Sequence, residues 1–337
     1  MKIITSIGFL LLSALFCNAQ PPTYHFLKSF PVEGEGRWDY LSINPTTGYL
    51  YVSHATQVNI FNGQGDAIGV IPNTTGVHGV AFATDYRKGY ISNGKLNSVG
   101  VFDMKNNEVT EQIKTGDNPD AIIYDPFSRK IYVSNGKSNS ISVIDPGKDV
   151  VVATIPVGGK PEMIVSDEMG RIFVNLEDKS EIAVIQADRN EVIAHWPLGK
   201  GQEPTGLAID NKGHRLFAGC DKMLVVVNAM DGKIVDNITI GAGCDGVAYD
   251  PNVREIYTSN GADATLSIIK EVTPDKYMLL KNVPTQKGAK TLALDPAQQR
   301  IYMTTADFKP VKPATNGGKP GRPEIVEGTV RVLIYTR

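Results

Sequence analysis

A four-residue motif recurs seven times along this chain, about once in every 40 residues. It typically places an aromatic residue before a β-branched or small apolar residue and then a small residue, which suits a strand with one face buried. A repeat of this length builds one supersecondary unit per copy, and each unit needs its neighbours to complete a core. The seven copies are Tyr51-Val52-Ser53-His54, Tyr90-Ile91-Ser92-Asn93, Tyr132-Val133-Ser134-Asn135, Phe173-Val174-Asn175-Leu176, Phe217-Ala218-Gly219-Cys220, Tyr257-Thr258-Ser259-Asn260 and Tyr302-Met303-Thr304-Thr305.

The residues around the third copy show what one unit contains. Asp125-Pro126 and Asp145-Pro146-Gly147 are turn signals that end apolar runs, and Asn135-Gly136 is predicted to supply the left-handed positions of a hairpin. A single four-stranded sheet is too small to bury both faces, so it must pack against copies of itself. The four predicted strands cover residues 121–124, 131–134, 140–144 and 150–157.

Seven such units follow one another with no linker or change of composition between them. The sequence therefore predicts an all-β fold in one domain over residues 20–337: a seven-bladed β-propeller with four antiparallel strands in each blade. The units cover residues 36–75, 76–115, 116–157, 158–198, 199–240, 241–285 and 286–337.

The third copy, Tyr132-Val133-Ser134-Asn135, also carries a family resemblance. The chain resembles the YVTN-repeat, YncE-like β-propellers, whose name-giving tetrapeptide occupies this place. The resemblance covers nearly the whole chain after residue 20, and it implies an extracytoplasmic ligand-binding or scaffold protein. Lactonases and lyases use similar seven-bladed folds, so the fold alone does not choose a function.

Residues 1–19 have the features of a cleaved signal peptide. Lys2 precedes an apolar run, and Cys17-Asn18-Ala19 resembles a cleavage site before Gln20. A lipid anchor on Cys17 fits less well, because bulky Phe16 stands where a small residue is usual. We therefore expect a periplasmic or secreted protein. Nothing after this segment is apolar enough to span a bilayer.

The net charge of −2 gives no overall basic field, so nucleic acid is not an expected partner. Two cysteines remain after the signal peptide, Cys220 and Cys244, in adjacent units. In an oxidising compartment they could form a disulfide, or they could be two separate buried thiols. The sequence leaves both alternatives open.

The ends of the chain predict how the ring closes. Residues 23–32 resemble the fourth strands of other units, whereas the last unit stops after its third strand, at about residues 328–335. The N-terminal strand should therefore complete the last blade.

Two positions in each unit should share one face of the ring, which we call the top face. They are the start of the first strand and the loop between the second and third strands. Asp39, Asp120, Glu162 and Asp245 recur at the first of these positions. Carboxylates gathered at a narrow channel must take up protons, pair with a cation such as Arg37 or Lys290, or hold a divalent ion such as calcium or zinc. A polar channel filled with water is the alternative.

Other top-face residues are candidates for binding or catalysis. His78, between glycines, and Glu177 could move protons, although a hydrogen-bonded structural histidine is an equal alternative. Trp38 could stack on a ligand or pack between blades. The asparagine-glycine pairs, such as Asn93-Gly94, are interpreted as turns first. Further candidate ligand-binding residues are Arg37, His54, Asp178, Glu203, Lys290 and Asp307.

An insertion, residues 306–327, lengthens the second loop of the last unit. It is rich in proline and glycine and carries Lys309, Lys312, Lys319 and Arg322. It should lie over the top face, either as a lid across an acidic channel mouth or as a solvated loop.

The leading functional hypothesis is a monomeric extracytoplasmic propeller that binds a small molecule or protein at the acidic mouth of its channel. The competing hypothesis is a metal-dependent lactonase or related hydrolase that uses the channel carboxylates. The sequence contains no serine-hydrolase, phosphate-loop or dinucleotide motif, but propeller enzymes assemble their sites from scattered residues.

Overall fold

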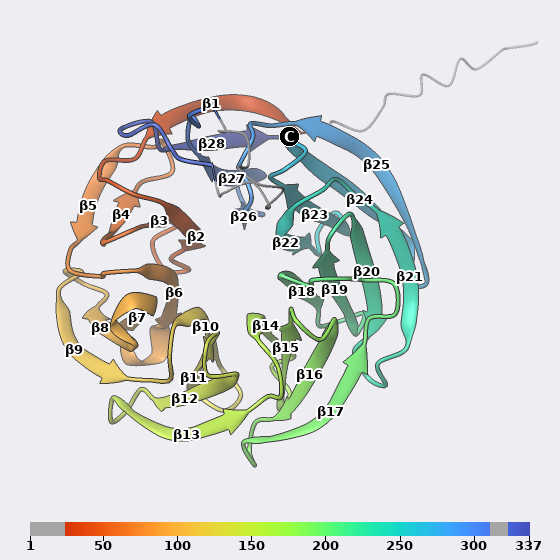
Figure 1. Cartoon of the computed structure of the whole chain (residues 1–337), viewed down its shortest axis with the longest axis horizontal. Coiled ribbons are helices and arrows are strands. Elements are labelled where there is room, and N and C mark those ends of the chain that lie inside the picture. Colours follow the sequence, from red (N-terminus) through yellow and green to blue (C-terminus); the bar gives the residue numbers. More distant parts are fainter. Residues whose placement is uncertain (1–23, 311–322) are drawn as a thin grey trace, which may run out of the picture.

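The computed structural model describes residues 24–310 and 323–337. They form a ring of seven antiparallel sheets around a central axis, with four strands in each sheet (Figure 1). The predicted seven-bladed β-propeller is confirmed. The proposed signal peptide and part of the insertion, including Lys312, Lys319 and Arg322, lie outside the described residues.

Each blade runs from an inner strand beside the axis to an outer strand at the rim. The inner strands are β2 (Trp38–Ile43), β6 (Val77–Ala83), β10 (Pro119–Asp125), β14 (Pro161–Ser166), β18 (Gly206–Asp210), β22 (Cys244–Asp250) and β26 (Leu292–Asp295). The second strands, which carry the repeated motif, are β3 (Leu50–His54), β7 (Lys88–Asn93), β11 (Lys130–Asn135), β15 (Arg171–Leu176), β19 (Arg215–Cys220), β23 (Glu255–Asn260) and β27 (Arg300–Thr305).

The third strands are β4 (Gln57–Phe61), β8 (Ser98–Asp103), β12 (Ser140–Asp145), β16 (Glu181–Gln186), β20 (Met223–Asn228), β24 (Thr265–Thr273) and β28 (Arg331–Thr336). The outer strands are β5 (Ala67–Ile71), β9 (Val109–Lys114), β13 (Val150–Pro156), β17 (Glu191–Pro197), β21 (Ile234–Thr239), β25 (Lys276–Pro284) and β1 (His25–Pro31). Two short 3-10 turns, η1 (Thr84–Tyr86) and η2 (Gly94–Leu96), flank β7.

The ring closes between the two ends of the chain, as predicted. Strand β1 pairs antiparallel with β28 and completes the last blade, in which β26 and β27 are the inner strands. The pairing runs from His25 opposite Thr336 to Pro31 opposite Arg331. The N-terminal strand is therefore the outer edge of a blade whose other strands come from the C-terminal end.

The aromatic residues of the motif fill the space between blades. Tyr51, Tyr90, Tyr132, Phe173 and Phe217 are all nearly or fully buried. The inner and third strands carry β-branched and leucine side chains that complete one hydrophobic cluster per pair of blades. Burial of these side chains on both faces of every sheet explains why the chain needs all seven copies.

The turns after the motif differ from the prediction. Asn135 belongs to β11 and is fully buried, and its side-chain amide donates to the hydroxyls of Ser140 and Ser142. The left-handed residue is Asn139, with φ of 50°. The four-residue turn needs its positive φ at the last position, where asparagine tolerates it.

Cys220 and Cys244 are two free, buried thiols. Burial raises the pKa of both, to about 12 for Cys220. Of the two alternatives that the sequence left open, the structure has the separate thiols. Among the described residues, no helix is long and apolar enough to cross a membrane.

Candidate functional site

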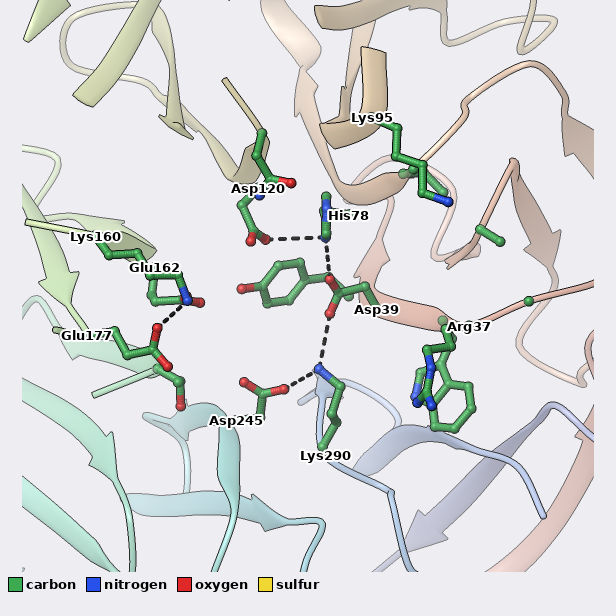
Figure 2. A pocket seen from close by; sticks show the side chains of 18 residues that line it. Arg37, Asp39, His78, Lys95, Asp120, Lys160, Glu162, Glu177, Asp245 and Lys290 are labelled. Carbon is green, nitrogen blue, oxygen red and sulfur yellow. Dashed lines mark hydrogen bonds and ion pairs between the residues drawn. The ribbon is translucent and has the colours of Figure 1, made fainter. Parts of the chain in front are cut away.

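A cavity of about 610 Å³ opens on the axis at the top face. Every blade contributes at least one side chain to its wall, and most of these come from the start of an inner strand. Figure 2 shows that most of its charged residues point toward one another across the axis, whereas Arg37 and Lys95 lie at one side. The charged residues that line it are Arg37, Asp39, His78, Lys95, Asp120, Lys160, Glu162, Glu177, Asp245 and Lys290.

Side chains of the repeat fix the backbone of these residues from the neighbouring blade. Ser92 Oγ donates to the Asp120 carbonyl at 2.5 Å, and Ser134 Oγ donates to the Glu162 carbonyl at 2.6 Å. Ser259 bonds the Lys290 carbonyl in the same way, at 2.5 Å. The small polar residue of the motif therefore positions the residue of the next blade that faces the channel.

Four of the charged residues form a continuous chain of contacts in the order Asp245, Lys290, Asp39 and His78. Lys290 contacts Asp245 closely and lies 3.5 Å from Asp39 Oδ1. His78 Nδ1 donates to the other Asp39 oxygen at 2.5 Å. Burial alone would raise the pKa of Asp39, but the charges of Lys290 and His78 hold it below its usual value. Burial lowers the pKa of His78, whereas Asp39 and Asp120 raise it above its usual value.

A second network lies within blade 4. Lys160 Nζ is 2.6 Å from Glu162 Oε1 and also contacts Glu177. Burial, followed by the charge of Asp120, raises the pKa of Glu162 to about 8, although Lys160 opposes this. The two glutamates in turn raise the pKa of Lys160 despite its burial. Glu162 is therefore largely protonated at pH 7.

Asp120 lies between the two networks. Its Oδ1 is buried, lies 3.6 Å from His78 Nδ1, and accepts no hydrogen bond from the described residues. Burial raises its pKa to about 6, with Asp39 adding to the effect and His78 opposing it. Asp120 is the most weakly paired carboxylate of the cavity, because the nearby His78 Nδ1 donates its hydrogen bond to Asp39 instead.

Tyr40 closes the floor of the cavity. It comes from β2 of blade 1, yet it packs against the hydrophobic cluster of blades 3 and 4, so its ring crosses the channel. Burial and the charges of Asp120 and Glu162 raise the pKa of Tyr40 well above its usual value. The phenol therefore stays neutral and can donate a hydrogen bond.

Nine of the residues predicted from the sequence line this cavity: Arg37, Trp38, Asp39, His78, Asp120, Glu162, Glu177, Asp245 and Lys290. Trp38 is only 6% exposed and packs in the core of blades 1 and 7, with its ring 6.3 Å from that of Phe308. Packing between blades, one of its two predicted roles, therefore accounts for most of its surface.

Four predicted ligand-binding residues do not line the cavity. His54 is fully buried, with its ring nitrogens 3.1 Å from the carbonyls of Glu33 and Gly36. Asp178 is exposed and accepts a hydrogen bond from the Lys160 backbone. Asp307 pairs with Arg331, and Glu203 is exposed outside the cavity. The repeat register alone did not reveal which of the predicted side chains would line the cavity.

Sequence reasoning missed Tyr40, Lys95 and Lys160. Lys160 stands just before Pro161, at the start of an inner strand, where the repeat register already pointed to the channel. Tyr40 had no such signal, because its role depends on the diameter of the channel.

The described stem of the insertion lies at the same face. Phe308 pairs with Ile325 across a short bridge, and Lys309 pairs with Glu324. Arg37, which the sequence offered as a partner for the channel carboxylates, donates instead to the Pro323 carbonyl of this stem.

One group of the described residues has atoms close enough to share a metal ion. The ligand atoms of Asp39, His78 and Asp120 all lie within 4.8 Å of one another. Two of the three are already engaged, since His78 Nδ1 bonds Asp39 and Asp39 also contacts Lys290. A metal bound through His78 Nδ1 would have to displace its hydrogen bond to Asp39.

Comparisons with known proteins show the fold. Hydrazine synthase of Kuenenia stuttgartiensis superposes with a TM-score of 0.67 and 18% identity, over 78% of this chain and 91% of that chain. The RRP9 WD40 repeats superpose with a TM-score of 0.74 and 10% identity, over 91% of this chain and 97% of that chain. The U3-55K structure superposes with a TM-score of 0.73 and 10% identity, over 90% of this chain and 98% of that chain. No family model and no curated protein sequence matches the chain. At these identities the similarity shows a seven-bladed β-propeller and no particular function.

Proposed function

We propose that this protein is an extracytoplasmic β-propeller that binds a small molecule in the axial cavity. The observation that carries the proposal is the cavity itself: about 610 Å³, lined by ten charged side chains, and closed below by Tyr40. Small-molecule sites are typically concave and occupy roughly 300–1,000 Å³. A closed floor with converging polar groups suits a small ligand better than a flat protein surface.

The extracytoplasmic location rests on the sequence of residues 1–19, with its single lysine, apolar run and small-residue cleavage site. Cell fractionation, with mass spectrometry of the mature N-terminus, tests it. A mature chain beginning at Gln20 in the periplasm or medium is expected, and an unprocessed cytoplasmic chain would contradict it.

A thermal-shift screen of small molecules tests the binding function, using two matched variants. Lys95 lines the cavity and Lys137 holds the same place in the next blade without lining it, and both are exposed. Lys95→Trp narrows the cavity mouth without removing any hydrogen bond described above. A compound that stabilises the wild type and Lys137→Trp but not Lys95→Trp supports the proposal. If no compound discriminates between the two variants, the proposal fails.

The metal-dependent hydrolase of the sequence analysis is separated from this proposal by elemental analysis and a lactone-hydrolysis assay. Asp39, His78 and Asp120 are the residues that would hold the ion, which would polarise a carbonyl group and activate water. Stoichiometric metal together with turnover that Asp39→Asn abolishes would favour the hydrolase over a binding protein.

A further inference from the structure

The axial cavity has fewer cations than its carboxylates require. Lys160 is shared by Glu162 and Glu177, and Lys290 is shared by Asp39 and Asp245. His78 bonds Asp39 and lies near Asp120. Five carboxylates thus share three cations. In so buried a place, unbalanced negative charge is costly, and protons or a bound cation must relieve it.

The other two basic residues of the wall lie too far to one side to supply the missing charge. Figure 2 places Arg37 and Lys95 on the side of the cavity opposite Glu162 and Glu177. Arg37 already donates to the Pro323 carbonyl. The excess negative charge is therefore concentrated around Asp120 and Glu162, on neighbouring blades 3 and 4.

Asp120 and Glu162 have incomplete partners, and both line the same cavity as Tyr40. The Asp120 side chain is 15% exposed and that of Glu162 is 10% exposed, so each presents a small part of its carboxylate to the cavity. No described residue donates a hydrogen bond to Asp120 Oδ1. Asp120 and Glu162 are also the two charges that raise the pKa of Tyr40 most. We call these three groups, all of which line the cavity, the oxygen-rich corner.

The geometry of this corner favours an organic cation over a metal ion. A metal held by Asp39, Asp120 and His78 Nδ1 would break the 2.5 Å bond between His78 and Asp39. An ammonium group placed against Asp120 and Glu162 leaves this bond intact. It brings three donors and one positive charge, which match the oxygen-rich corner. The cavity volume of about 610 Å³ also leaves room for the rest of an organic molecule.

We infer that the ligand is a small organic amine, whose ammonium group binds between Asp120, Glu162 and the Tyr40 hydroxyl. The inference rests on the proposed small-molecule function and specifies its ligand class. The ammonium group supplies the charge that the wall lacks, so binding displaces protons that Glu162 holds at neutral pH.

Isothermal titration calorimetry of the purified protein tests the inference. The probes are methylamine, benzylamine and 1,4-diaminobutane, their uncharged counterparts methanol, benzyl alcohol and 1,4-butanediol, and the chlorides of calcium and zinc. At least one amine should bind with a stoichiometry of one per chain, and its alcohol should not. Heats measured in two buffers of different ionisation enthalpy should show proton release.

Two variants locate the site. Glu162→Gln should weaken amine binding by about tenfold or more and abolish most of the proton release. Asp307→Asn removes an exposed carboxylate that pairs with Arg331 outside the cavity, and should bind like the wild type. Tyr40→Phe, which removes only one hydroxyl, should weaken binding several-fold. Unchanged affinity in Glu162→Gln, equal binding of amines and alcohols, or binding of the metal ions alone would each overturn the inference.

Failure of this inference is distinguishable from failure of the proposed function. If no amine binds at millimolar concentration, but a neutral or anionic compound stabilises the wild type and not Lys95→Trp, the ligand class is wrong and the binding function stands. If no compound of any charge binds, both are wrong.

Discussion

Asp39 and Glu162 occupy the same place in two blades, yet their surroundings drive their charges in opposite directions. Each follows the start of an inner strand, and a hydroxyl of the preceding blade holds each backbone carbonyl: Thr291 holds Asp39 at 2.8 Å and Ser134 holds Glu162 at 2.6 Å. Asp39 contacts two cations and its pKa falls, whereas Glu162 shares one cation and its pKa rises to about 8. Equal backbone placement therefore does not give equal chemistry. The number and sharing of neighbouring cations decide it.

The largest expected effect comes from breaking the Asp39 side of this comparison. Asp39→Asn removes the charge that pairs with both His78 and Lys290, and leaves two buried cations with fewer partners. We expect a loss of roughly 3 kcal/mol in the free energy of unfolding. Urea titration at pH 7 measures it. Asp245→Asn, which affects only the Lys290 pair, is the control and should cost less. Equal losses of unfolding free energy in the two variants would show that pairing with both His78 and Lys290 gives Asp39 no extra contribution to stability.

Replacing Glu162 should change the free energy of unfolding in the opposite direction to replacing Asp39. The folded pKa of Glu162 is about 8, above its ordinary value, so folding favours the protonated form. Its contribution is favourable at low pH and is lost as the pH rises toward 8. Glu162→Gln should therefore match the wild type near pH 5 and exceed it at pH 8 by about 1–3 kcal/mol.

Thermal or urea unfolding of both proteins across this pH range measures the difference for Glu162→Gln. Lys160 keeps Glu177 as a partner in the variant, so it is not left unpaired. A variant that is less stable than the wild type at pH 8 would show that the Lys160 pair outweighs the burial of Glu162.

Asp120, which lies between the two networks, offers a smaller test. Its charge helps to raise the pKa of His78, so Asp120→Asn should lower that pKa. NMR titration of the histidine ring protons measures it. The ring-proton signals of His195, which lies 3.3 Å from Glu181 on the outer strand of blade 4, are an internal control for effects far from the axis. An unchanged His78 would mean that Asp120 carries no charge in this pH range.

The smallest expected effect tests whether the motif serine positions the backbone of the channel-facing residue in the next blade. Ser134→Ala removes the hydrogen bond to the Glu162 carbonyl and should cost about 1 kcal/mol. Ser53 holds the same motif position in blade 1, but its buried hydroxyl has no partner among the described residues. Ser53→Ala should therefore cost nothing measurable. Equal unfolding midpoints for the two variants would remove the proposed role of the motif serine.

Most of the fold could be predicted from the sequence, because the interactions that form each blade are local and are repeated along the chain. The predicted strand at residues 131–134 became β11, and the predicted outer strand at residues 23–32 became β1. The failures were also local: the left-handed residue is Asn139 rather than Asn135-Gly136. The hydrophobic period fixes strands well, but the turn length decides where a positive φ falls.

The sequence by itself determined the number of blades, the closure by the N-terminal strand, and most of the inner-strand positions that face the channel. These follow from a repeat whose strands pair with near neighbours in the chain. Only the tertiary structure decided which charges meet, that Tyr40 crosses the channel, and that His54 is buried. Lys290 and Asp39 are 251 residues apart, and they are brought together because the ring closes. Charge pairing across the axis depends on the channel width and on distant blades, and the repeat specifies neither.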